Sequence, residues 1–123
     1  MDINKYLSKQ YKSPGCWLLV VDIYINELGL LVENYTPEKT SLKDIANAFR
    51  IELHKGVHGF IKTETPKDYS VVLMSKMDNK NPHHAGIYYQ GKVLHVLNDM
   101  NYYQDLFSLS DQYKQMEFWI NEN

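Results

Sequence analysis

Residues 14–24 of the chain read PGCWLLVVDIY, and the rest of the sequence is organised around this stretch. A Pro-Gly break leads into the only cysteine, Cys16, which opens a long apolar run. The run is longer than a typical strand, so we predict a helix from Cys16 to Leu31 despite its β-branched residues. Its few polar residues gather near one face, which predicts a central helix that other elements cover.

Two interpretations of Cys16 follow from this position. A thiol in the first turn of a helix lies beside unpaired backbone N–H groups and the positive end of the helix dipole. Both favour the thiolate, which is the reactive form of cysteine. The alternative is an inert residue, because free cysteine is commonly a small member of the core.

Composition limits the classes of protein that fit. With 123 residues, of which 44% are hydrophobic, we predict one domain over residues 1–123 that buries a core. The formal charge of −2 provides no basic field, so neither nucleic acid nor a membrane surface is expected as a partner. One cysteine excludes an internal disulfide. The first residues contain no apolar signal core, so no signal peptide is expected.

Periodicity along the chain predicts helices first and strands afterwards. Helical spacing is predicted over residues 2–12 and 16–31, and from a cap at residues 40–41 to about residue 53. Beyond Gly59 we predict strands at residues 60–63, 69–75, 83–89, 92–97 and 116–120, with a tight turn at residues 90–91 and a loop over residues 98–105. This order predicts an α+β domain with an antiparallel sheet.

Counting from the tight turn places two histidines together. A two-residue turn at Gln90-Gly91 pairs Gly86 with His95. His84 then lies on the same sheet face, diagonal to His95, with Gly86 contributing no side chain between them. His83 is expected to point to the opposite face.

A thiol at a helix start, a histidine to deprotonate it and a second group to orient that histidine form a nucleophile, base and orienter. Taken singly, each of these is an ordinary polar residue. A metal site is a further alternative, because His83, His84, His95 and Asp99 are ligand types. Their spacing matches no zinc signature, so no metal is expected.

Three segments together carry a family resemblance: CWLLV at residues 16–20 leading into Ile23-Tyr24, HAGIY at residues 84–88, and KVLH at residues 92–95. In this order they resemble the NlpC-type cell-wall cysteine peptidases, in particular short forms from bacteriophage tails. The resemblance covers about residues 11–96.

The resemblance implies a papain-like core whose catalytic helix packs on the antiparallel sheet. It implies that Cys16 is the nucleophile, His84 the general base and His95 the residue that orients His84. The implied positions for substrate and oxyanion binding are Tyr11 (with Tyr6 as its alternative), Gly15 and Trp17. The implied reaction is amide hydrolysis through a thioester, in the peptide stem of peptidoglycan, with no cofactor. The implied partners are the stem peptide, or another amide substrate, and phage tail proteins, in a virion or in the host cytoplasm.

One departure keeps other functions open. Many family members carry Asp directly before the nucleophile, where it receives the amino end of the stem peptide, whereas this chain has Gly15. A different thiol amidase or acyltransferase on the same scaffold is therefore an alternative. A second alternative is a structural tail component with a vestigial triad, in which Tyr102, Tyr103 and Trp119 would form an interface.

Overall fold

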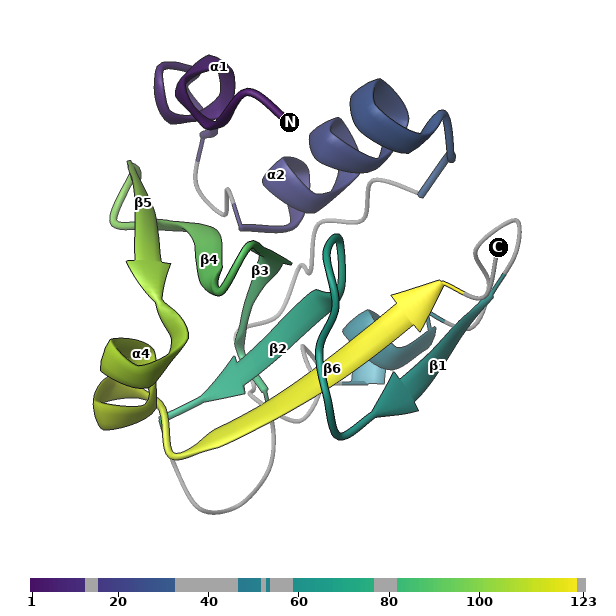
Figure 1. Ribbon diagram of the computed structural model, residues 1–123, viewed down its shortest axis with the longest axis vertical. Coiled ribbons are helices and arrows are strands. Elements are labelled where there is room, and N and C mark those ends of the chain that lie inside the picture. Colours follow the sequence, from purple (N-terminus) through teal and green to yellow (C-terminus); the bar gives the residue numbers. More distant parts are fainter. Residues whose placement is uncertain (13–15, 33–46, 52, 54–58, 77–81, 122–123) are drawn as a thin grey trace.

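The computed structural model describes residues 1–12, 16–32, 47–51, 53, 59–76 and 82–121. Its centre is a six-stranded sheet with the strand order β1-β6-β2-β3-β4-β5, in which all pairs are antiparallel (Figure 1). The strands are β1 (Phe60–Thr63), β2 (Val71–Ser75), β3 (His84–Tyr89), β4 (Lys92–Leu97), β5 (Met100–Asp105) and β6 (Gln115–Asn121).

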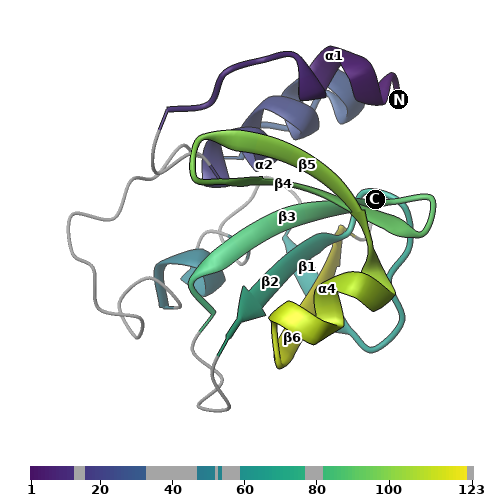
Figure 2. The same ribbon diagram turned by 90° about the vertical axis from the view of Figure 1, so that its left-hand side faces the viewer.

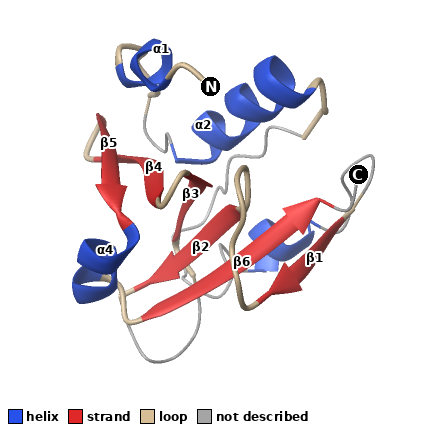
Figure 3. Cartoon of the chain, in the orientation of Figure 1, coloured by secondary structure: helices blue, strands red, loops and turns tan. Residues whose placement is uncertain are grey.

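Helices cover both faces of this sheet. They are α1 (Ile3–Leu7), α2 (Cys16–Ile23) with its π-helical continuation η1 (Tyr24–Leu28), and α4 (Leu106–Gln112); residues 47–51 are also helical. Figures 2 and 3 show α1 and α2 together on one side, and α4 beside the end of β5 and the start of β6. The predicted α+β class with an antiparallel sheet is confirmed. No helix in the described ranges has the length and apolarity needed to span a membrane.

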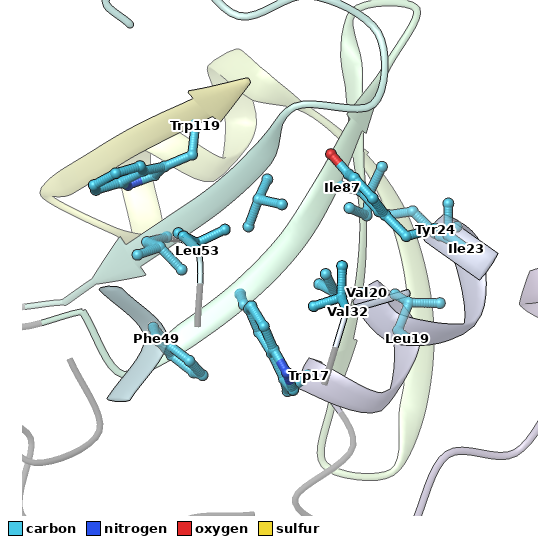
Figure 4. Close-up of a cluster of buried hydrophobic side chains, with 14 of the residues drawn as sticks. Trp17, Leu19, Val20, Ile23, Tyr24, Val32, Phe49, Leu53, Ile87 and Trp119 are labelled. Atoms are coloured by element: carbon cyan, nitrogen blue, oxygen red, sulfur yellow. The ribbon is translucent and has the colours of Figure 1, made fainter. Parts of the chain in front are cut away.

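The larger core lies between α2 and the sheet, where α2 packs against β3 and β4. Figure 4 shows Trp17, Leu19, Val20 and Ile23 of the helix facing Ile87 and the more distant Trp119. Each fully buried aliphatic side chain of this kind stabilises the fold by about 1.5–3 kcal/mol. A smaller core on the other face contains Val72, Met74, Val93, Leu109 and Tyr113. Because both faces are covered, every residue of β2 is buried.

The central helix begins at Cys16 as predicted, but it ends earlier than Leu31. Gly29 adopts a left-handed conformation with φ of 65° after Leu28, and its N–H bonds the carbonyl of Tyr24. Glycine tolerates this conformation without strain, which makes it a common helix terminator. The first helix is also shorter than the predicted residues 2–12. The predicted cap at residues 40–41 lies outside the described residues.

The largest error of sequence analysis concerns residues 98–105, which are not a loop. Asn98 and Asp99 form a tight turn with φ of 52° and 63°, and Met100–Asp105 then pairs with β4 as strand β5. Helix α4 was also missed. Asp105 caps it by accepting hydrogen bonds from the Phe107 N–H (2.8 Å) and the Ser108 hydroxyl (2.9 Å). The strands at residues 60–63 and 92–97 have the predicted bounds, and β2, β3 and β6 begin within two residues of theirs.

Candidate active site

Cys16 lies where α2 begins, against the start of β3. Its thiol is a hydrogen-bond acceptor for the backbone N–H groups of Ala85, Trp17 and Cys16 itself. The first of these belongs to the strand residue directly after His84. The helix start therefore brings the only thiol of the chain to the strand that carries the first predicted histidine.

His84 and His95 meet as the counting predicts. The turn at Gln90-Gly91 pairs Gly86 with His95, and the His84 Nε2 lies 2.8 Å from the His95 Nδ1. Gly86 is essential to this diagonal contact. A Cβ atom on it would lie 2.7 Å from the Leu94 carbonyl oxygen and 3.0 Å from the His95 Cβ. Both imidazoles are buried, with 6% and 0% of their surfaces exposed.

Gln104 extends this pair to a third side chain. The His95 Nε2 lies 2.6 Å from the Gln104 Oε1, because β5 runs beside β4 and pairs Gln104 with Val93. Sequence analysis missed this residue because it predicted a loop here. The signal that could have found it is the Asn98-Asp99 pair, since both residue types tolerate the left-handed conformation of a hairpin turn.

The Gln104 carbonyl determines which ring nitrogens carry protons along the line of hydrogen bonds from Gln104 through His95 to His84. An amide oxygen only accepts hydrogen bonds, so the His95 Nε2 carries a proton and the His95 Nδ1 is an acceptor. His84 must then donate from its Nε2, and its Nδ1 is left as an acceptor. A neutral histidine in this tautomer can take a proton from a thiol.

Tyr113, which follows α4, closes the other side of His84. The two rings stack with centroids 5.5 Å apart and planes inclined by 11°. Tyr113 is buried, and its hydroxyl has no hydrogen-bond partner among the described residues. Burial raises the pKa of this hydroxyl, and a negative charge on Cys16 would raise it further.

Burial holds both Cys16 and His84 in their neutral forms. It raises the pKa of the Cys16 thiol, and the three backbone N–H groups offset only part of this effect. Burial, followed by the nearby charges of His95, His83 and Lys76, lowers the pKa of His84 to about 3. Burial also lowers the pKa of His95, against the opposing effect of Gln104. The N–H groups at the helix start favour the thiolate as expected, but burial has the larger effect, so the thiol is neutral.

The other predicted site residues lie elsewhere. The Tyr11 hydroxyl donates to Asp22 at 2.6 Å, and Asp22 lies roughly 9 Å along the helix axis from Cys16. The alternative, Tyr6, donates to Glu27 at 2.5 Å. Trp17 has its ring in the core, stacked on Phe49 at 5.3 Å, and its backbone N–H bonds the thiol. Gly15 lies outside the described residues.

The structure also bears on the predictions made for Trp119, for His83 and for a metal site. Trp119 is 5% exposed and belongs to the core, so it is not an interface residue. His83 precedes β3, so strand alternation does not set its direction; its Nε2 accepts from the Lys76 N–H at 3.2 Å. In the part of the chain that the structure describes, no three His, Cys, Asp or Glu residues are grouped so that they could hold a metal ion.

The fold defines the chain as an α+β domain with an antiparallel sheet. The site is a partly buried thiol at a helix start, against the strand that carries the first of two linked imidazoles. No family model, no curated protein and no solved structure matches the chain. The geometry of the site and the motifs of the sequence are therefore the basis for a proposed function.

Proposed function

We propose that the chain is a cysteine peptidase or amidase, in which Cys16 attacks an amide carbonyl and His84 serves as general base and then as general acid. The observation that carries this proposal is the line of hydrogen bonds from His84 through His95 to Gln104. It leaves the Nδ1 of His84 as the free acceptor of that ring, and Cys16 accepts from the N–H of Ala85, the residue after His84. Base and orienter in this order are what nucleophilic catalysis by a thiol requires.

The proposed reaction has two stages. As the Cys16 sulfur bonds to the carbonyl carbon, the thiol proton moves to the His84 Nδ1, and the carbonyl π electrons move to the oxygen. The tetrahedral intermediate then expels the amine, which takes the proton from His84, and a thioester remains. Water attacks the thioester with His84 as base, releases the acid and restores the thiol.

The substrate proposed is the peptide stem of peptidoglycan, with delivery by a phage tail or a similar assembly. Support for this part comes from the motifs at residues 16–20, 84–88 and 92–95, which resemble those of NlpC-type peptidases. The same resemblance supports a papain-like organisation of the core. Gly15 removes the carboxylate that many family members place before the nucleophile, so we propose a stem whose amino group is not held by that contact.

Hydrolysis of purified peptidoglycan fragments by the full chain tests this proposal. New amino groups are counted by mass spectrometry for the wild type, Cys16→Ala and His84→Ala, with Tyr102→Phe as a control that changes an aromatic residue near His95. We expect new amino groups with the wild type and the control, and none with the other two variants. Equal release by Cys16→Ala and the wild type would refute the assignment of the nucleophile.

One observation favours a structural tail component as a second candidate. Burial holds both the thiol and His84 neutral, which is also expected of a site that has lost its activity. Alkylation of Cys16 by iodoacetamide separates the two candidates. A working pair gives labelling that slows at least tenfold in His84→Ala, whereas a vestigial pair gives equal rates.

A further inference from the structure

The hydroxyl of Tyr113 is an unusual feature of this site. The residue is 1% exposed, and its oxygen has no hydrogen-bond partner among the described residues. Leaving a buried hydroxyl unpaired costs roughly 1–3 kcal/mol, and an unpaired polar group of this kind is rare enough to need an explanation. Phenylalanine would fill the same space in the smaller core and keep the stacking on His84 without this cost.

The position of the hydroxyl relates it to the thiol. The Tyr113 ring is stacked on His84, and the Cys16 thiol lies against the strand residue after His84. A charge on Cys16 raises the pKa of the hydroxyl, which has no hydrogen-bond partner among the described residues. A donor of this kind could serve an oxygen atom attached to the carbon that bonds to sulfur, as in a tetrahedral intermediate.

We propose that Tyr113 donates its O–H to the oxyanion that forms when Cys16 attacks a carbonyl group. The proposal deepens the proposed function and rests on it. In the step concerned, the carbon–sulfur bond forms, the thiol proton moves to His84, and the carbonyl π pair becomes a lone pair on oxygen. The phenol keeps its proton and shares it with that oxygen until the intermediate collapses.

The surroundings of Tyr113 suit a donor. Burial and the nearby Cys16 both raise the pKa of its hydroxyl, so it remains protonated throughout the neutral range. The Lys76 ammonium lies 5.9 Å from the ring centroid, and the His83 ring lies 6.2 Å away. Tyr11 and Tyr6, the tyrosines expected to serve the site, have their hydroxyls on Asp22 and Glu27 instead.

Two electrophiles test the proposal on the full chain. 4-Nitrophenyl acetate reacts through a tetrahedral oxyanion, and its rate is followed by release of nitrophenolate. Iodoacetamide alkylates the same sulfur by displacement of iodide, without an oxyanion. Tyr113→Phe removes only the hydroxyl. Tyr102→Phe is the matched control. The ring centroid of Tyr102 lies 5.7 Å from that of His95, but its exposed hydroxyl donates to the Met100 sulfur.

We expect Tyr113→Phe to acetylate about 10²–10³-fold more slowly than the wild type, which is the usual effect of losing one oxyanion donor. Alkylation should change by less than about twofold, and thermal stability should be equal or higher, because an unpaired buried group is removed. Tyr102→Phe should match the wild type with both reagents.

Two results would overturn the proposal. Equal acetylation by Tyr113→Phe and the wild type would remove the hydroxyl from the reaction. An equal loss of acetylation and alkylation would mean that it acts on the thiolate, not on an oxyanion. Failure of the proposed function gives a different result from both. In that case the wild type and His84→Ala are alkylated at the same rate, whatever residue is at position 113.

Discussion

The neutral state of His84 predicts a specific loss of stability in acid. In an unfolded chain a histidine has a pKa of about 6.5, whereas burial and the nearby charges lower the pKa of His84 in the fold to about 3. Below pH 6.5 the unfolded state therefore binds a proton that the folded state excludes. The contribution of neutral His84 to the unfolding free energy is fully present above pH 6.5. It is lost as the pH falls below this value, at up to about 1.4 kcal/mol per pH unit.

Between pH 6.5 and 4.5 this effect amounts to roughly 2–3 kcal/mol from His84 alone. The value is a large share of the 5–15 kcal/mol that usually stabilises a domain. The relevant perturbation is His84→Gln, which removes the titrating group and keeps a polar side chain. The slope of the unfolding free energy against pH reports how many more protons the unfolded state binds than the folded state. We expect this number to be smaller by about one in the variant, so the slope decreases by about 1.4 kcal/mol per pH unit.

Urea denaturation at pH 6.5, 5.5 and 4.5 measures these slopes. Tyr113→Phe is the control, because it changes a ring stacked on His84 without removing a group that titrates in this range. Equal slopes for the wild type and His84→Gln would refute the reasoning. NMR titration of the wild type gives an independent check, in which an imidazole assigned to His84 with a pKa near 6 would refute it as well.

Three further predictions concern the line of hydrogen bonds and its support. Gly86→Ala should lower the unfolding free energy by about 1–3 kcal/mol in urea denaturation, because its Cβ would lie 2.7 Å from the Leu94 carbonyl oxygen; an unchanged midpoint would contradict this. His95→Ala should reduce turnover less than Cys16→Ala does, because an orienter only holds the base, and equal losses would assign His95 a larger role. Gln104→Ala should cost roughly tenfold in turnover, the equivalent of one hydrogen bond, while Gln104→Glu should lose activity as the pH is lowered; unchanged turnover in the first variant and a wild-type pH profile in the second would exclude a role of Gln104 in the reaction.

Sequence analysis succeeds where local geometry determines the result. The two-residue turn at Gln90-Gly91 determines the register of β3 and β4, and this register alone places His84 diagonal to His95. The apolar run after Cys16 has a length that only a helix accommodates, and the structure starts α2 at that residue. These predictions needed no knowledge of the rest of the chain.

The errors have a different cause. Residues 100–105 read MNYYQD, in which apolar and polar residues do not alternate, so their pattern does not indicate a strand. They form β5 because β4 offers an open edge and the Asn98-Asp99 turn returns the chain to it. Gln104 and Tyr113 reach the site only through this strand and the helix that follows it, so the prediction of a loop over residues 98–105 hid both of them.

The charge of Cys16 also depends on tertiary structure. A helix start favours the thiolate by up to roughly 1–2 kcal/mol, which is an effect that a sequence pattern can predict. Removal of a charged group from water costs several kcal/mol, and this cost depends on which elements cover the site. Burial by the surrounding elements outweighs the helix start, so the neutral thiol prevails.

The neutral state of His84 and His95 explains why an amide, and not a carboxylate, suits position 104. A glutamate there would raise the pKa of His95 and favour its imidazolium form, in which the Nδ1 carries a proton and faces His84. The His84 Nε2 would then have to accept, and the proton of a neutral His84 would move to its Nδ1. In that tautomer His84 cannot receive the proton of Cys16. The Gln104 carbonyl accepts from His95 without adding charge, and thereby keeps the lone pair of His84 on the atom that the proposed reaction needs.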